Sequence, residues 1–172
     1  MLEREQVPAT LFLNSRWIEA NPALAGELAA NPAFLIGNHG TKHKPLSVTG
    51  REAYGIAGTP DASAAAQEVW GNHVILTELC GAPPQWFRSG TAHYDDVAIR
   101  IVEALGERVA GFSVNGDGGA TFTASQVETE TAAAEAGDIV IAHFNQPGSG
   151  TADGMAAAIR ALKRRGATFV TL

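Results

Sequence analysis

Hydrophobic and polar residues alternate along the chain in a way that predicts strands and helices in turn. Two short apolar runs have the length of strands, "ATLFLN" at 9–14 and "AFLIG" at 33–37. Between them, Asn21 and Pro22 open the helical segment "NPALAGELAA", because proline is favoured at the start of a helix. This part of the chain therefore predicts a strand, a helix and a second strand.

A long helix and an extended segment are expected next. Thr59 and Pro60 open an alanine-rich helix that runs to about Cys80, and "GAPPQWFR" then brings the chain into an extended segment ending at Arg88. The following helix is indicated by one apolar face at helical spacing, and it leads into the strand "VAGFSV" at 109–114. That face consists of Tyr94, Val97, Ile101 and Leu105.

The next helix has a clear start signal. Thr123 and Gln126 have the spacing of a capping box, in which each side chain bonds the other residue's backbone N–H. We expect this helix to run through about Ala136. Gly137 then ends it, because glycine readily adopts the left-handed conformation that closes helices. The apolar segment "DIVIAH" at 138–143 is the strand expected after it.

The last predicted elements are a helix that opens at Thr151 and stops at Gly166, and a final strand at 167–172. Six strands alternating with helices predict an α/β fold with a parallel sheet and helices packed around it. Periodicity alone does not separate a barrel from an open sheet.

The composition fits one compact domain. A chain of 172 residues, 45% of them hydrophobic and 17% charged, can bury most of its apolar surface in one core. We expect a single domain over residues 1–172. The formal net charge is −6. Basic residues are scattered apart from Lys163, Arg164 and Arg165, so no cationic stripe could follow a phosphate backbone, and no nucleic acid partner is expected.

The start of the chain and its cysteine content limit the kinds of protein that the sequence can represent. Segment 2–8, "LEREQVP", resembles the last turns of an amphipathic helix, yet Met1 begins inside it, so we expect a domain incomplete at its N-terminus. Cys80 is the only cysteine, which excludes an internal disulfide. The chain has no apolar run of bilayer length and begins with acidic residues where a signal peptide is basic, so we expect neither a membrane span nor an export signal. The compartment stays open.

Polar residues follow most of the predicted strands. In parallel α/β folds the ligand site lies beyond the carboxyl ends of the strands, where the connecting loops converge. Three of the five histidines fall on this rim. The rim residues are Asn14; Asn38, His39 and His43; Arg88; Asn115 and Asp117; and His143 with Asn145.

His39 and His43 in "IGNHGTKHKP" are the strongest metal candidates. Residues four apart on a helical turn project the same way, so both imidazoles could hold one divalent ion such as zinc. The alternative is a solvated pair of loop histidines. Lys42 and Lys44 count against the metal, because nearby positive charge weakens cation binding.

The other rim residues each have a plain structural alternative. His143 follows the buried run "IVIA" and is either a catalytic group or a hydrogen-bonded rim residue. Arg88 could extend over Trp86 as a surface arginine, and Asp117 in "NGDGG" could belong to a turn. His73, in the long helix, is read as a packing residue.

Three stretches resemble the polysaccharide deacetylases of the NodB-homology type, carbohydrate esterase family four. "IGNHGTKH" is similar to the metal motif of that family, and "WFRSGTAHYDDVAIRIVEALG" to its arginine motif and the helix after it. "GDIVIAHFNQPGSGTADGMAAAIRALKRRGATFVTL" resembles the closing strand, histidine motif and last helix-strand unit, and is the most specific match. The resemblance implies a distorted (β/α) barrel that removes N-acetyl groups from amino-sugar polymers or oligomers, chitin-like or peptidoglycan-like.

The resemblance also implies roles for individual residues. His39 and His43 would hold a divalent metal, zinc in the first place and cobalt or another ion as the alternative. His143 would be the general acid that protonates the leaving amine. Arg88 would orient the acidic base, and Asp117 would tune the catalytic histidine.

The sequence departs from the family pattern at several points. Gly40 stands where the family has serine or threonine, and "RSGTAHY" replaces an arginine-proline-proline-tyrosine pattern. The family's opening motif of threonine, phenylalanine, two aspartates and glycine, which supplies the base and the third metal ligand, does not occur here. We therefore expect weak metal binding and little or no deacetylase activity from the chain as written. We also expect self-association through the exposed edge of the first strand. The alternative function is a catalytically silent domain that binds carbohydrate or a partner.

Overall fold

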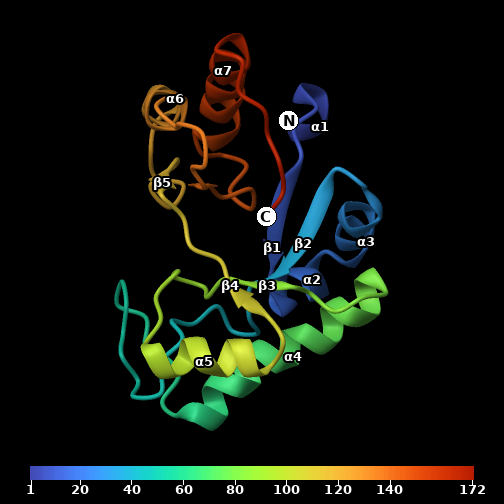
Figure 1. The fold of residues 1–172 in the computed structure, drawn as a ribbon, viewed down its shortest axis with the longest axis vertical. Helices are drawn as coiled ribbons and strands as arrows, with labels where there is room; N and C mark the ends of the chain where they lie inside the picture. Colours follow the sequence, from blue (N-terminus) through green and yellow to red (C-terminus); the bar gives the residue numbers. More distant parts are fainter. The chain divides into compact units, whose positions relative to one another are not determined.

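The computed structural model describes residues 1–172 and consists of helices and short strands (Figure 1). The chain forms two compact units. The 10–110 unit contains Thr10–Ala110 with Thr171–Leu172, and the 111–170 unit contains Gly111–Val170 with Met1–Ala9. The expectation of a single domain over residues 1–172 stays a prediction.

The 10–110 unit is built on a four-stranded sheet in the order β1-β2-β3-β4. Asn38 pairs in parallel with Phe87, and Phe87 pairs in parallel with Val109. β1 stands at one end of this order, so its use as an edge for self-association stays a prediction. The strands are β1 Ala9–Leu13, β2 Phe34–Asn38, β3 Trp86–Phe87 and β4 Arg108–Val109.

Side-chain caps fix where the helices of this unit begin. Asn14 accepts a hydrogen bond from the Trp17 backbone N–H at 3.0 Å and starts a helix that the sequence pattern had not predicted. Asp61 and Asp95 cap the helices that follow them by accepting from the N–H groups three residues on, each at 2.8 Å. The helices are α2 Ser15–Ala20, α3 Pro22–Ala30, α4 Ala62–Cys80 and α5 Asp96–Ala104.

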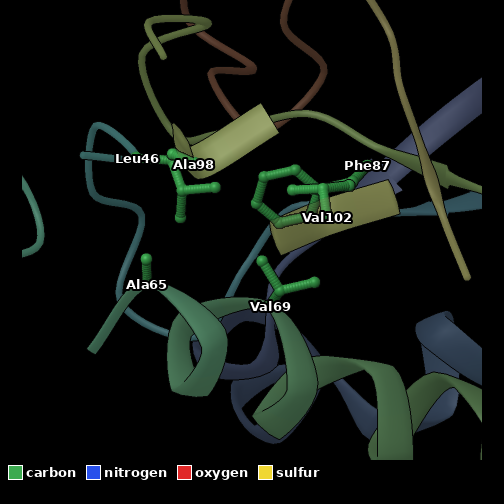
Figure 2. Close-up of a cluster of buried hydrophobic side chains, with 6 residues drawn as sticks. All are labelled: Leu46, Ala65, Val69, Phe87, Ala98 and Val102. Atoms are coloured by element: carbon green, nitrogen blue, oxygen red, sulfur yellow. The ribbon is translucent and has the colours of Figure 1, made fainter. Parts of the chain in front are cut away.

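The core of this unit lies where α4 and α5 pack against β3. Figure 2 shows Val69 of α4, Val102 of α5 and Phe87 of β3 converging in one cluster. All three side chains are fully buried. The cluster of buried residues is Leu46, Ala65, Val69, Phe87, Ala98 and Val102. Leu46 of this cluster lies in the loop after β2, and Phe87 is the last residue before the loop after β3.

The 111–170 unit contains a parallel pair, in which Val114 and Val140 lie opposite each other. The capping box of Thr123 and Gln126 is present, as the sequence predicted. Arg160 of the last helix donates to the Glu5 carboxylate at 2.6 Å, which ties the first helix to this unit. The elements are β5 Val114–Asn115, β6 Val140–Ile141, α1 Leu2–Glu5, α6 Ala124–Ala132 and α7 Thr151–Arg164.

The predicted parallel α/β class is confirmed, while two of the predicted strands are wrong. The strand expected at 109–114 is divided, because its start pairs with β3 as β4 and its end pairs with β6 as β5. The strand expected at 167–172 does not form. In this segment the Ala167 N–H donates to the Leu162 carbonyl at 3.0 Å and the Leu172 N–H to the Thr10 hydroxyl at 3.0 Å. The first bond closes the end of the preceding helix and the second has a side-chain acceptor, so neither makes a ladder.

No helix in residues 1–172 has the length and apolarity that a membrane crossing requires.

Candidate active site

His39 and His43 lie in the loop between β2 and α4, and their rings meet edge to face. The ring centroids are 4.8 Å apart at an angle of 86°. The expectation that they share a helical turn is wrong, because Gly40 and His43 have φ angles of 74° and 59°, outside the right-handed helical region. The predicted proximity of the two imidazoles nevertheless holds. A tight loop produces it in place of a helix.

A buried glutamate of α4 shapes this loop. The Glu68 side chain accepts hydrogen bonds from the backbone N–H groups of Lys42 at 2.8 Å and Lys44 at 3.3 Å. A Cβ at Gly40 would lie 2.6 Å from the Glu68 carboxylate, so glycine replaces the serine or threonine of the family pattern where space is lacking. Burial raises the pKa of Glu68, and the backbone N–H donors of the loop partly oppose that shift.

The backbone immediately after β3 fixes the orientation of the His39 ring. His39 Nδ1 lies 2.7 Å from the carbonyl oxygen of Arg88. A carbonyl can only accept, so Nδ1 carries the proton and Nε2 carries the lone pair that a metal ion would use. The His39 backbone N–H also donates to the Leu13 carbonyl at 3.0 Å, which holds the start of the loop against β1.

Arg88 is buried, with 7% of its surface exposed, so the alternative of a surface arginine over Trp86 is wrong. Its Cζ lies 4.5 Å from the centre of the Phe12 ring, and its Nε donates to the Ala110 carbonyl at 3.2 Å. Trp86 is covered by Arg108 instead, at 4.2 Å. Burial lowers the pKa of the Arg88 guanidinium. Arg88 therefore contributes a fixed carbonyl to His39 and a positive charge beneath the same loop.

Gly90 allows the loop after β3 to touch the histidine loop. A Cβ at this position would lie 2.3 Å from the His43 carbonyl carbon and oxygen, so no other residue fits without moving the backbone. The Gly90 N–H donates to the Lys44 carbonyl at 3.3 Å. The two loops that bear His43 and Arg88 thus form one packed assembly.

Beneath the loop lies a buried polar network centred on Asn38. The Asn38 side chain donates to Glu107 Oε1 at 2.8 Å and accepts from the Gly40 N–H at 2.9 Å and the Asn72 amide at 2.8 Å. His73 Nδ1 lies 2.8 Å from the same Glu107 oxygen, while Glu107 Oε2 is buried without a hydrogen-bond partner. His73, expected to be a packing residue, therefore belongs to a polar chain that ends at the histidine loop.

We predict that Glu107→Ala lowers the free energy of unfolding by about 2–4 kcal/mol, because it strands the buried amide of Asn38 and the His73 ring. Urea unfolding followed by circular dichroism measures this change. The matched control is Glu103→Ala on the exposed side of α5, which should leave stability almost unchanged. Equal loss in both variants would contradict the role of the network.

A conservative variant separates charge from shape at the same position. Burial raises the pKa of Glu107, and the hydrogen bonds from Asn38 and His73 only partly oppose it. The folded state then holds its proton more tightly than the unfolded state, so stability contributed by Glu107 falls as pH rises from about 4.3 through the folded pKa. Glu107→Gln should lose this dependence while keeping the hydrogen bond to Asn38.

In the 111–170 unit, Asp117 and His143 form a tight pair. The buried Asp117 carboxylate accepts from the His143 backbone N–H at 2.7 Å, and His143 Nδ1 lies 3.0 Å from its Oδ1. The Thr151 hydroxyl donates to Oδ2 at 3.0 Å. Burial would raise the pKa of Asp117, but the hydrogen bonds and charge of His143 with the Thr151 hydroxyl outweigh it and hold that pKa below its usual value.

This pairing defines the state of the His143 ring. The ionised Asp117 carboxylate can only accept, so His143 Nδ1 carries a proton and Nε2 faces any further partner as the nitrogen that exchanges protons. The His143 side chain is 37% exposed and Asp117 is 0% exposed. The reading of Asp117 as an ordinary turn residue is insufficient, since the "NGDGG" turn aims its carboxylate inward at His143.

The five candidate residues therefore fall into two groups. His39, His43 and Arg88 lie together in the 10–110 unit, and His143 and Asp117 lie together in the 111–170 unit. Their assembly around one crevice, and the role of each in catalysis, stay predictions. Residues 1–172 contain no group of three His, Cys, Asp or Glu side chains arranged to hold a metal ion. The two imidazoles fit a divalent ion as part of a ligand set.

Sequence analysis missed three residues that hold these groups in place. Glu68 and Glu107 are almost fully buried, and Thr151 bonds Asp117 besides starting α7. A glutamate inside an apolar helical segment, "AAAQEVW", was an available signal for Glu68. Glu107 gave no such signal, because it stands in a turn between a helix and a short strand.

Comparison with known proteins identifies the family. The sequence profile described as "Polysaccharide deacetylase" matches residues 1–110. Among curated proteins, no sequence match is found.

Solved structures share the fold. One is a CE4 family pseudoenzyme from Bacillus anthracis, with a TM-score of 0.82 and 19% identity over 99% of this chain and 56% of the other. A peptidoglycan N-acetylglucosamine deacetylase bound to a hydroxamate-type benzamide gives 0.81 and 22%, over 99% and 76%. A family 4 acetyl xylan esterase from Clostridium thermocellum bound to cobalt gives 0.81 and 18%, over 99% and 77%.

The chain spans 56% of the Bacillus anthracis protein's structure, and this likeness, below 25% identity, concerns the fold. The expected fold of the NodB-homology type is confirmed by these structures. Because the family profile covers residues 1–110, well over half of the sequence, the chain belongs to the polysaccharide deacetylase family.

Proposed function

We propose that the protein hydrolyses N-acetyl groups on amino-sugar polymers or oligomers, chitin-like or peptidoglycan-like, with a divalent ion at His39 and His43. The observation that carries the proposal is the adjacent pair of imidazoles of His39 and His43, in which the Arg88 carbonyl sets the tautomer of His39. Similar structures include one peptidoglycan deacetylase and one esterase that holds cobalt. Zinc and cobalt both accept imidazole ligands.

Each group of residues has a chemical task in this proposal. A bound divalent ion would polarise the acetamide carbonyl and activate water. His143 is suited to give a proton to the leaving amine, because the Asp117 carboxylate accepts from its Nδ1 and so orients the ring. Arg88, buried beneath the histidine loop, would orient an acidic base. An amine leaves poorly without such a proton.

Acetate release tests the proposal. The 172-residue chain is incubated with tetra-N-acetyl-chitotetraose and cobalt or zinc, and acetate is measured with and without a chelator. We expect slow release that stops with the chelator and is lost in His143→Ala. The rate should be low, since the chain supplies two imidazoles of a site that usually takes three protein ligands. Release that ignores the chelator and survives His143→Ala would overturn the proposal.

The second candidate is a catalytically silent domain that binds carbohydrate. One similar structure is a pseudoenzyme of the same family, and that observation favours this candidate. Oligosaccharide binding without any chelator-sensitive acetate release, even at saturating metal, would support it over hydrolysis.

A further inference from the structure

Tyr54 is an aromatic side chain that the fold leaves in solvent. Its exposed fraction is 81%, the highest among the large hydrophobic residues of the 10–110 unit. The next is Trp70, at 48%, which stacks on His73 with ring centroids 4.5 Å apart. Tyr54 therefore buries little surface in folding this unit, and core packing does not explain its place.

The turn that carries Tyr54 holds it in a disfavoured conformation. Tyr54 and Gly55 have φ angles of 54° and 74°, and the turn is closed by two hydrogen bonds between Ala53 and Ile56, at 3.1 and 3.0 Å. Turns with two positive φ angles favour asparagine and glycine, and a bulky ring is disfavoured there. Residues in such disfavoured backbone conformations cluster at functional sites, where the conformation holds a side chain in the position that the function needs.

A second ring fixes the orientation of Tyr54. The His93 ring meets it edge-on, with centroids 5.1 Å apart at 87°. His93 Nδ1 lies 2.8 Å from the Thr91 carbonyl, so this nitrogen donates and the imidazole is fixed in turn. The edge contact with His93 covers little of the Tyr54 ring, so one face of the phenol stays open to solvent while its orientation is held.

The loop bearing His93 is built onto the loop bearing His43. The His93 carbonyl accepts from the Leu46 N–H and from the Ser89 hydroxyl, each at 3.0 Å. Gly90 in the same loop is packed against the His43 backbone. The aromatic pair and the candidate metal histidine thus belong to one rigid cluster of loops in the 10–110 unit.

We propose that Tyr54 and His93 form a subsite that binds a sugar ring of a β-linked N-acetylated amino-sugar oligomer. This proposal rests on the function proposed above. It adds a place where the oligomer is bound by a sugar other than the one that loses its acetyl group. A pyranose presents apolar C–H groups on its face and hydroxyls at its rim. The C–H groups can pack on the open face of the phenol, and the sugar hydroxyls can hydrogen-bond to the phenol hydroxyl.

Binding of tetra-N-acetyl-chitotetraose to the 172-residue chain, measured by calorimetry in the presence of a chelator, tests the subsite. Tyr54→Ala should weaken binding by about tenfold or more, and Tyr54→Trp, which restores a flat ring, should recover it to within about twofold. The matched control is Trp70→Ala, which removes another exposed ring of the same unit and should leave the affinity unchanged. Circular dichroism establishes that each variant is folded.

The outcomes separate this inference from the function on which it rests. No binding by the unaltered chain, or equal affinity in the chain and Tyr54→Ala, overturns the subsite. An equal loss in Trp70→Ala also overturns it. Because neither metal nor turnover is needed, failure of acetate release with a Tyr54-dependent affinity would reject hydrolysis and keep the subsite.

Discussion

Replacing His39 with alanine is expected to abolish measurable cobalt binding by the chain. His39 supplies one of the two adjacent imidazoles. The Arg88 carbonyl accepts from its Nδ1 and so leaves the lone pair on Nε2. Loss of a residue that merely orients a metal ligand costs about 10–100-fold in affinity, so loss of the ligand itself should exceed about a hundredfold. Binding to the unaltered chain is expected to be weak. Titration followed by the visible absorption of cobalt or by calorimetry measures both.

The control for this experiment is His93→Ala. This variant removes an imidazole of the same unit that contacts Tyr54 and does not belong to the pair of His39 and His43, so the affinity for cobalt should be unchanged. His43→Ala should match His39→Ala. Tight cobalt binding that survives the loss of both His39 and His43 would place the site elsewhere in the chain.

Local signals explain why so much of the framework could be predicted from sequence. The start of α6 follows from Thr123 and Gln126 three residues apart, since a capping box involves only neighbouring atoms. β1 and β2 follow from apolar runs of strand length, whose side chains the fold buries or half-buries. The predicted 109–114 strand failed because its two ends pair in different sheets, and strand pairing depends on distant segments.

The candidate site was predictable in its residue types and less so in its geometry. The spacing of His39 and His43 suggested a helical turn, but the loop takes its shape from Glu68, which lies 25 residues beyond His43 in the chain. The sequence alone does not separate a turn residue from a functional one at Asp117, because "NGDGG" is a stretch that could simply be a turn. Its importance becomes visible only when the turn brings its carboxylate to His143.

Asp117→Ala should lower the free energy of unfolding by about 3–5 kcal/mol, because it leaves the His143 N–H and ring and the Thr151 hydroxyl without their common acceptor. Urea unfolding at pH 7 measures the loss. Asp138→Ala is the matched control, since Asp138 is an exposed aspartate of the same unit with its own local hydrogen bonds, and it should change stability little.

The pH dependence of this stability has a definite sign. The pKa of Asp117 is lower in the folded protein than its usual value, so the stability that it contributes is fully present above about pH 4 and is lost as the pH falls through the folded pKa. The difference in unfolding free energy between the unaltered chain and Asp117→Asn should therefore shrink as the pH falls below about 4. A difference that instead grows below about pH 4 would mean that Asp117 is protonated in the folded state. It could not then hold His143 as the proton donor to a leaving amine.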